Sequence, residues 1–560
     1  MVALTLTLGA ALSAAVLAGC AAPPPAAPIA TGPVQLRILA INDFHGNLQP
    51  PQSGIRIKDP ADASKTLTLP AGGAEYLHTA AAKLMQGHPN HVFVAAGDLI
   101  GASPLLSALF HDEPTVESLS LMGLQIAAVG NHEFDKGSAE LLRMQNGGCK
   151  PGTGCKGPSG KFDGAAYHYL AASTIDERSG KTLFPPYEVR RFEGVPVAFI
   201  GLTLQATPQM VVPAGVAGLR FRDEADTVNG LVPELKSQGV EAIVVLIHEG
   251  GVPTGDYNEC PGISGEIVDI VKRFDKAVDI VISGHTHRAY NCRIDGRLVT
   301  SGDKYGTIVT AIDVQLDRRS GDVISARADN SLVRHDVYSR DPGQTALIDS
   351  YAKLAVPLAK RVVGSISTHL LVATNPAGES PLGLVIADAQ LAATTKPEDG
   401  GAQIAFMNRG GIRTDLLRPD DGQVRYEQLF AAQPFYNNLV TMTLTGAQVL
   451  KVLEEQWKNA DYSRLMQVSS GFSYSWDQNR RPGARVVPGS VMLNGKPLDP
   501  LASYRVTVNS FMASGGDGYS VFNEGVDRRT GGFDVEALEA YIASHPQLAP
   551  PTAGRIAKLP

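Results

Sequence analysis

Short apolar runs alternate with longer stretches of helical character through the first half of the chain. Short apolar runs bounded by glycine and polar residues are typical of buried strands, and the stretches between them have the composition and spacing of helices. We expect strands at 34–41, 91–96, 126–129, 195–203, 240–247 and 278–283. We expect helices at 73–85, 223–238 and 265–274. Strands that alternate with helices in this way predict an α/β domain.

Polar clusters follow most of these strands. They read DFHGN from Asp43, GDL from Gly97, GNHEFD from Gly130, HEG from His248 and GHTH from Gly284. Because the carboxyl ends of parallel strands lie along one edge of a sheet, the pattern predicts one site built from five separate segments. From 298 to 316 the apolar residues alternate instead, with Gly302 and Gly306 as turns, which indicates a closing antiparallel piece.

The second half of the chain has its own alternation of apolar stretches, at 383–394, 403–407, 439–444, 446–457 and 504–509. Before them, residues 341–362 have a helical stripe that is interrupted by Pro357, and we interpret this stretch as an interdomain helix. The stripe consists of Leu347, Tyr351, Leu354, Leu358 and Val362. At 560 residues the chain exceeds the usual size of one hydrophobic core. We predict a first domain at 34–340, a linker helix at 341–362 and a second α/β domain at 363–560.

The composition is that of an ordinary globular protein, with 44% hydrophobic and 19% charged residues. A net charge of -7 and a pI near 6.0 give no global attraction to nucleic acid or to acidic membranes. We therefore expect no nucleic acid polymer as a partner. An anionic substrate would have to be bound by local cations.

The N-terminus has the pattern of an export signal. Residues 1–20 are uncharged and apolar or small, and they end in the lipobox-like sequence LAGC at Cys20. Residues 21–33 are rich in proline and alanine and resemble an extended tether. We expect export to the periplasm or cell envelope, with membrane attachment through a lipidated Cys20. Plain secretory cleavage is the alternative.

Four further cysteines, Cys149, Cys155, Cys260 and Cys292, form an even set, as expected of disulfides in an oxidising compartment. Three pairings are possible, and the short loop between the first two favours Cys149 with Cys155 and Cys260 with Cys292. A zinc site made by the four is less favoured, because no ligand-like pairs flank them.

The candidate metal ligands are imidazoles, carboxylates and one amide from the strand-end clusters. They are Asp43, His45, Asp98, Asn131, His248, His285 and His287. Such mixed ligands suit Zn, Mn, Co or Fe. Seven ligands are too many for one ion, so we expect two divalent metal ions, with Asp98 as the bridging carboxylate. Two metals about 4 Å apart can hold a bridging hydroxide and neutralise a phosphoryl oxygen, which predicts phosphoester hydrolysis.

The alternative is that these are ordinary strand-end and turn residues, which each of them alone could be. As a set they are less easily explained, because five of the 13 histidines follow buried-strand patterns in the same topological position. The order DxH, GD, GNHEFD, H and GHTH resembles that of the calcineurin-like metallophosphatases, and DFHGN, GNHEFD and SGHTH resemble their 5'-nucleotidase branch. The resemblance extends over nearly the whole chain from Val34 onward. It implies a metallophosphatase-type β-sandwich flanked by helices.

The resemblance also implies roles for single residues. Asp43, His45, Asp98 and His287 would surround one metal, and Asp98, Asn131, His248 and His285 would surround the other. His132 would not be a ligand. It would stabilise the transferring phosphoryl group or assist the leaving oxygen, and Asp135 would orient it.

Three motifs of the second half are candidates for substrate binding: NRGGIR from Asn408, PFYN from Pro434 and FMASGGDGY from Phe511. Guanidinium groups suit anions, and two aromatic rings can sandwich a planar base. These motifs resemble those of the nucleotide-binding domain attached to this class of phosphatase. The resemblance implies that Arg413 holds the phosphate, Phe435 and Phe511 the base, and Asp517 the ribose. The other candidates are Asn408, Arg409 and Asn437.

We therefore predict an exported two-metal 5'-nucleotidase that hydrolyses nucleoside 5'-monophosphates, and also nucleoside di- and triphosphates or UDP-sugars as further candidates. The linker helix would act as a hinge that carries substrate from the second domain to the metals. The alternatives are a 2',3'-cyclic-nucleotide 2'-phosphodiesterase with 3'-nucleotidase activity, and a surface protein that binds nucleotides without catalysis.

Overall fold

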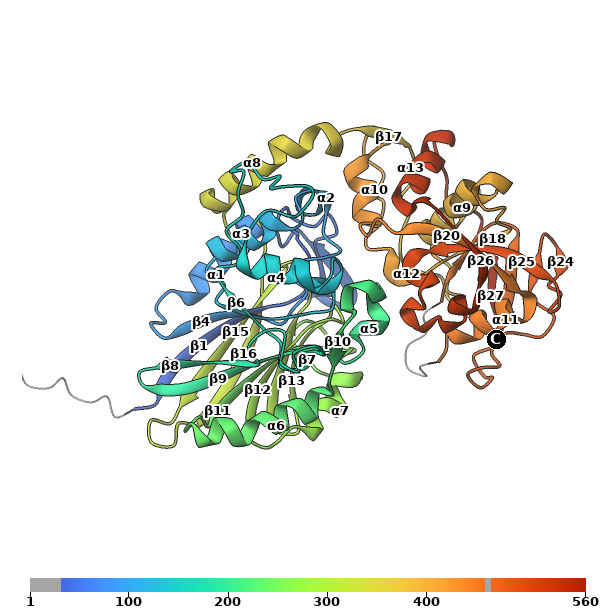
Figure 1. Ribbon diagram of the computed structural model, residues 1–560. Coiled ribbons are helices and arrows are strands. Elements are labelled where there is room, and N and C mark those ends of the chain that lie inside the picture. The colour runs from blue at the N-terminus through green and yellow to red at the C-terminus, as the bar shows by residue number, and fades with distance from the viewer. Residues whose placement is uncertain (1–31, 459–464) are drawn as a thin grey trace, which may run out of the picture.

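The computed structural model describes residues 32–458 and 465–560. The predicted signal peptide, Cys20 and most of the tether lie outside the described residues. Two lobes are joined by a long helix that runs along the upper edge of the first lobe (Figure 1). Among the described residues, no helix is both long enough and apolar enough to cross a membrane.

Two six-stranded sheets make up the first domain, and their central strands are parallel. In spatial order, one consists of β16 (Val323–Leu332), β15 (Ile308–Leu316), β1 (Val34–Ile41), β4 (His91–Ala95), β5 (Ile126–Ala128) and β6 (His168–Leu170). The other consists of β13 (Ala289–Ile294), β14 (Arg297–Gly302), β12 (Val278–Ser283), β11 (Ala242–His248), β9 (Val195–Thr203) and β8 (Tyr187–Phe192).

The strands are apolar on both faces because both faces are covered. In β1, Ile38 packs between the two sheets, whereas the next residue, Leu39, packs under the helices of the outer face. The helices α1 (Ala74–Met85), α3 (Glu113–Leu121) and α4 (Ser138–Asn146) cover one sheet. The helices α6 (Glu224–Ser237) and α7 (Glu266–Arg273) cover the other. The architecture is the predicted helix-flanked sandwich.

The stretch 298–316 is not a hairpin. β14 belongs to one sheet and β15 to the other, so the residues between them cross the sandwich. β15 does close its sheet, by pairing antiparallel with β1. The alternation of apolar residues could not distinguish a strand pair from a crossover, because both have two buried strands in succession.

The linker helix α8 (Pro342–Ala359) is shorter than predicted, and Asp341 caps it by accepting a hydrogen bond from Gln344 N. The predicted stripe is partly wrong. Tyr351 is buried, but Leu354 and Val362 are about half exposed, and the buried face continues through Ile348, Ala355 and Ala359. Of the two alanines, Ala355 packs with Phe110 of the first domain, and Ala359 lies in an apolar cluster made mainly of second-domain residues.

The second domain is built on a mixed sheet. Its order is β21 (Gln467–Val468), β18 (Ile404–Met407), β25 (Ser503–Asn509), β20 (Asn438–Thr445) and β26 (Val526–Phe533). On one face lie α9 (Pro381–Thr394), α10 (Tyr426–Ala432) and α13 (Asp534–Ser544). On the other lie α11 (Gly446–Glu455), β22 (Phe472–Trp476) and β27 (Ile556–Lys558). Leu105, at the start of α2 (Leu105–Ala108), belongs to the apolar cluster under α9, α10 and α13. The two domains are therefore in apolar contact.

Both disulfides have the favoured pairing, Cys149 with Cys155 and Cys260 with Cys292. The second joins the loop after β11 to strand β13, which ties a segment next to the strand-end clusters to the sheet edge.

Candidate metal centre

The predicted ligands come together at one edge of the sandwich. The ligands form two groups, and within each group the donor atoms lie within 4.8 Å of one another. One group is Asp43, His45 and His287, and the other is Asp98, His248 and His285. Asn131 joins the second group, because its Oδ1 lies 3.1 Å from His285 Nδ1. The five strand ends β1, β4, β5, β11 and β12 therefore supply all seven side chains.

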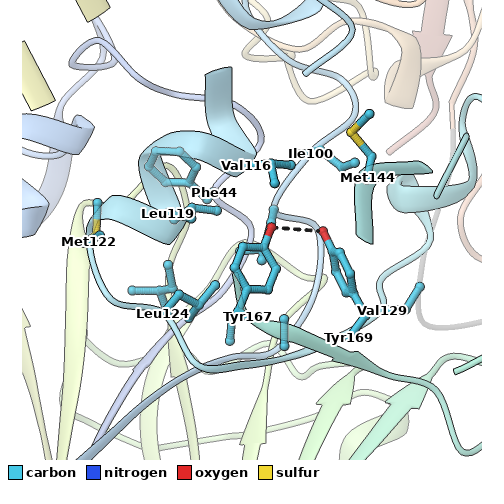
Figure 2. Packing of buried hydrophobic residues seen from close by; sticks show 14 of the residues in the cluster. Phe44, Ile100, Val116, Leu119, Met122, Leu124, Val129, Met144, Tyr167 and Tyr169 are labelled. Atoms are coloured by element: carbon cyan, nitrogen blue, oxygen red, sulfur yellow. Dashed lines mark hydrogen bonds between the residues drawn. The ribbon is translucent and has the colours of Figure 1, made fainter. Parts of the chain in front are cut away.

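Buried apolar residues anchor these loops in the core of the first domain. Phe44, between two ligands, is completely buried, and Val129 lies next to the GNHEFD turn (Figure 2). Five of the candidate ligands have an unusual backbone conformation. Asp43, His45, Asp98, His285 and His287 all have positive φ, between 46° and 69°. Non-glycine residues rarely adopt this conformation, and each such strained residue costs of the order of 1–3 kcal/mol.

Hydrogen bonds fix which imidazole nitrogen faces the centre. His45 Nδ1 lies 2.8 Å from Gly101 O, and His248 Nδ1 lies 2.8 Å from Ala96 O. A carbonyl oxygen can only accept, so each Nδ1 carries a proton, and in the neutral ring Nε2 presents a lone pair. The two Nε2 atoms point inward, because His45 Nε2 is 3.1 Å from His287 Nε2 and His248 Nε2 is 2.9 Å from Asp98 Oδ2.

This donor set fits divalent cations. Burial lowers the pKa of His45 and His287 well below the usual value and that of His285 to about 4, so these rings are neutral at physiological pH. At His248, burial lowers the pKa but Asp98 outweighs it and raises the pKa to about 10. The position next to Asp98 therefore strongly attracts positive charge. Neutral imidazoles and carboxylates around it are the ligands that Zn, Mn, Co and Fe accept.

Asp98 lies between the two groups. Its Oδ2 is 3.5 Å from His45 Nε2 and 2.9 Å from His248 Nε2, and its Oδ1 accepts a hydrogen bond from His132 N. This placement agrees with the expected bridging role, which stays a prediction.

His132 and Asp135 form the expected pair at the edge of the centre. His132 Nδ1 is 2.9 Å from Asp135 Oδ2, and the His132 ring lies edge-on to His45, with centroids 5.0 Å apart. Burial lowers the pKa of His132, but the charges of Asp135 and Asp98 outweigh it and raise the pKa. Such a histidine can donate a proton to a departing oxygen.

Two residues of the second domain reach this centre. Arg413 Nη2 lies 3.5 Å from His45 Nε2, and its guanidinium carbon lies 5.8 Å from the centre of the Phe435 ring. Phe435 stacks on His132 with centroids 5.8 Å apart and planes at 23°. Arg413 and Phe435 thus connect the predicted substrate site with the predicted metal site.

Four of the other predicted substrate residues make contacts within the second domain. Asn408 donates to Asp517 Oδ2 at 2.7 Å and accepts from Asn509 at 2.9 Å. Phe511 lies against Gly516, where an added Cβ would stand 2.5 Å from the ring. The Asn437 amide bonds to Asp534 and Ser510. Arg409 is exposed. Binding roles for these residues stay predictions.

Sequence reasoning missed Glu133 and Tyr305. The Glu133 carboxylate is buried and accepts hydrogen bonds from four backbone N–H groups around the metal centre. The Tyr305 ring lies edge-on to His45 and His287, with centroids 6.1 and 5.8 Å apart, and Lys304 Nζ stands 4.7 Å from the Tyr305 ring centre. A carboxylate inside the GNHEFD turn was a usable signal for Glu133. Tyr305 lies on the sheet crossover that was interpreted as a closing antiparallel piece.

Two family models match the chain. Calcineurin-like phosphoesterase matches residues 36–289, and 5'-nucleotidase, C-terminal domain matches residues 362–524. Endonuclease YhcR of Bacillus subtilis is 33% identical over 91% of this chain, but this chain spans only 40% of that protein. A 5'-nucleotidase of Vibrio parahaemolyticus is 26% identical over 96% of this chain and 94% of that protein.

Among solved structures, the 5'-nucleotidase precursor from Thermus thermophilus superposes with a TM-score of 0.76 at 27% identity. The match covers 94% of this chain and 99% of the Thermus chain. Because it extends over both domains, it confirms the predicted fold class.

Proposed function

Because the chain belongs to the calcineurin-like phosphoesterases that carry a C-terminal 5'-nucleotidase domain, we propose that it hydrolyses nucleoside 5'-monophosphates to nucleoside and phosphate with two divalent metal ions. The family supports the enzyme class, a metal-dependent phosphoric monoester hydrolase. The substrate, the number of metals and the roles of single residues belong to the proposal.

One observation carries the proposal: a cation of the second domain meets the metal ligands of the first. Arg413 Nη2 is 3.5 Å from His45 Nε2, and Arg413 Nε is buried without a hydrogen bond among the described residues. A guanidinium with an unused buried donor beside a metal centre suits a phosphoryl oxygen. An ordinary structural arginine would have its buried donors paired.

The side chains around the centre would divide the work. When bound, two divalent cations would supply an activated water nucleophile and neutralise phosphoryl charge. Arg413 would bind a phosphoryl oxygen and fix its orientation. His132, held by Asp135 through Nδ1, would turn Nε2 to the substrate and donate a proton to the leaving oxygen of the ribose. Phe435, stacked on His132, would exclude water from that side.

Steady-state kinetics of three variants test these roles. His132→Asn should lower kcat by about 10²–10⁴-fold without loss of bound metal, because it removes a proton donor but no ligand. Arg413→Ala should lower kcat/KM by about 10–100-fold, the value of a hydrogen bond to a charged group. Arg409→Ala, in the same motif but exposed, should have the smaller effect. Equal effects of the two arginines would contradict the assignment.

Hydrolysis of a phosphodiester is the second candidate, which includes the 2',3'-cyclic phosphodiesterase with 3'-nucleotidase activity. It is favoured by the 33% identity to a protein named an endonuclease. A panel of 5'-AMP, 3'-AMP, 2',3'-cyclic AMP and single-stranded DNA, with metal analysis of the purified protein, separates the two. We expect 5'-AMP to be the best substrate. Preference for a diester would select the second candidate, and absence of both bound metal and turnover would favour a binding protein.

Two finer parts of the proposal concern place and motion. The protein acts in the periplasm or cell envelope, attached through a lipid on Cys20. Mass spectrometry of the mature N-terminus tests the attachment, because a lipid on Cys20 changes the mass of that segment. Substrate binds on the second domain, and movement around α8 carries it to the metals. A crosslink that locks the two domains and leaves turnover unchanged would contradict this motion.

A further inference from the structure

The Glu133 carboxylate lies between two ligand-bearing loops. Its Oε2 accepts from Asp98 N at 2.9 Å and from Gly130 N at 2.6 Å. Its Oε1 accepts from Leu99 N at 2.7 Å and, more weakly, from Ile100 N at 3.4 Å. One side chain therefore binds the backbone of the loop after β4 and the backbone of the turn after β5.

The two loops touch each other directly. A Cβ on Gly97 would lie 2.8 Å from Gly130 N, and a Cβ on Gly130 would lie 2.5 Å from Asp98 N. With backbone packed against backbone, no side chain can absorb a shift of one loop relative to the other. The spacing of the loops therefore depends on the bonds between them, which are those of the Glu133 carboxylate and the hydrogen bond from His132 N to Asp98 Oδ1.

We propose that Glu133 is a positioning residue of the metal centre. It sets the distance between Asp98, on the first loop, and Asn131, on the second, and so determines how tightly the group of Asp98, Asn131, His248 and His285 binds its metal. Glu133 itself does not contact the metal or the substrate. The proposal rests on the metal centre of the proposed function but not on which phosphoester is hydrolysed.

Glu133→Gln tests this most sharply, because it keeps the size of the side chain. The carboxylate offers acceptors on both oxygens, whereas the amide must place an NH2 group against backbone N–H donors. We expect metal affinity to fall by about 10–100-fold, as is typical when a residue that supports metal ligands is changed. The measurement is the dissociation constant for Mn²⁺, from titration calorimetry of the metal-stripped full chain.

The second domain offers a matched control. Glu379 is also buried and also accepts from several backbone N–H groups, those of Gly554, Arg555 and Ile556, at 2.7 to 3.0 Å. Glu379→Gln likewise replaces a carboxylate that accepts backbone hydrogen bonds, but in the second domain, away from the metal loops. We expect it to lower the melting temperature while leaving Mn²⁺ affinity unchanged.

Glu133→Asp keeps the charge but shortens the reach, and it replaces Glu133→Gln if that variant does not fold. It should weaken Mn²⁺ binding as well, in protein whose circular dichroism is that of the wild type. Wild-type Mn²⁺ affinity in a folded Glu133 variant would overturn the proposal, and so would an equal loss of affinity in Glu379→Gln. If the wild-type protein binds metal but hydrolyses no nucleotide, only the proposed function fails.

Discussion

At the scale of the residue, the metal centre depends on positions that have no space for a side chain. Gly130 is the clearest, since an added Cβ would lie 2.2 Å from Asp98 Oδ1 and 2.5 Å from Asp98 N. Gly130→Ala should therefore displace Asp98 and abolish tight metal binding and activity. Atomic emission analysis of the dialysed protein measures the retained metal.

Gly230, on the exposed face of α6, is the matched control, because nothing lies within 4 Å of a Cβ there. Gly230→Ala should keep the metal content of the wild type and stabilise the protein by roughly 0.5–1 kcal/mol, the usual preference for alanine over glycine in a helix. A Gly130→Ala protein with full metal content would show that Asp98 can move without loss of its ligand role.

The seven candidate ligands could be selected from the sequence at this scale, because each of them lies in a polar cluster that follows an apolar run. The fold brings these clusters together, and their role as ligands stays a prediction. The role of Glu133 could not be predicted, since it consists of backbone hydrogen bonds to residues 98–100 and 130. Nor could the sequence separate Arg413 from Arg409, because only the fold decides which guanidinium faces the first domain.

At the scale of the element, the pairing of β11 with β12 contains a titratable group. The register shifts between Ile243 and Val244, and Asp279 accepts a hydrogen bond from Ile243 N at 2.9 Å. Burial raises the pKa of Asp279 to about 7. The unfolded chain releases this proton near pH 4, so the free energy of unfolding falls as pH rises from about 4 to 7 and stays lower above.

Asp279→Asn keeps an acceptor for Ile243 N but carries no charge. The free energy of unfolding of the variant, measured relative to that of the wild type, should therefore rise by about 2–4 kcal/mol between pH 4 and pH 8. This follows from roughly 1.4 kcal/mol for each unit by which the pKa of Asp279 is raised. Urea unfolding at both pH values measures the difference. A constant difference between the two proteins would mean that Asp279 has an ordinary pKa.

The predicted elements were accurate where both faces of a strand are buried, as in β9 and β11, because such strands form continuous apolar runs. Edge strands such as β8 and β16 were missed, since their exposed faces carry charged residues that break the pattern. In α8 the apolar residues were recognised, but the buried face includes Ala355 and Ala359, which the stripe of larger residues left out, and it does not include Leu354.

At the scale of the whole molecule, one disulfide ties the region after His248 to the sheet. Cys260 and Cys292 are separated by 32 residues. Closing a loop of this length in the unfolded chain accounts for about 3–4 kcal/mol of stability in the chain-entropy model. The Cys260→Ser, Cys292→Ser double variant should lose about that much in denaturant unfolding. The smaller Cys149–Cys155 loop should matter less.

The mutual placement of the domains was beyond sequence reasoning. It depends on contacts such as Leu105 in the core of the second domain and Phe435 on His132, which join residues hundreds of positions apart. No local pattern of apolar residues encodes a contact of this kind.

The positive φ angles of Asp43, His45, Asp98, His285 and His287 also bear on how this protein can change over generations. Glycine or asparagine would adopt this backbone conformation with less strain at each of these positions. A lineage that no longer needs the chemistry would therefore gain stability by losing ligands, so mutation pressure and folding both act to erase the centre. Folding alone would not maintain these five backbone conformations, so their presence is what we expect of a protein that uses the proposed metal centre.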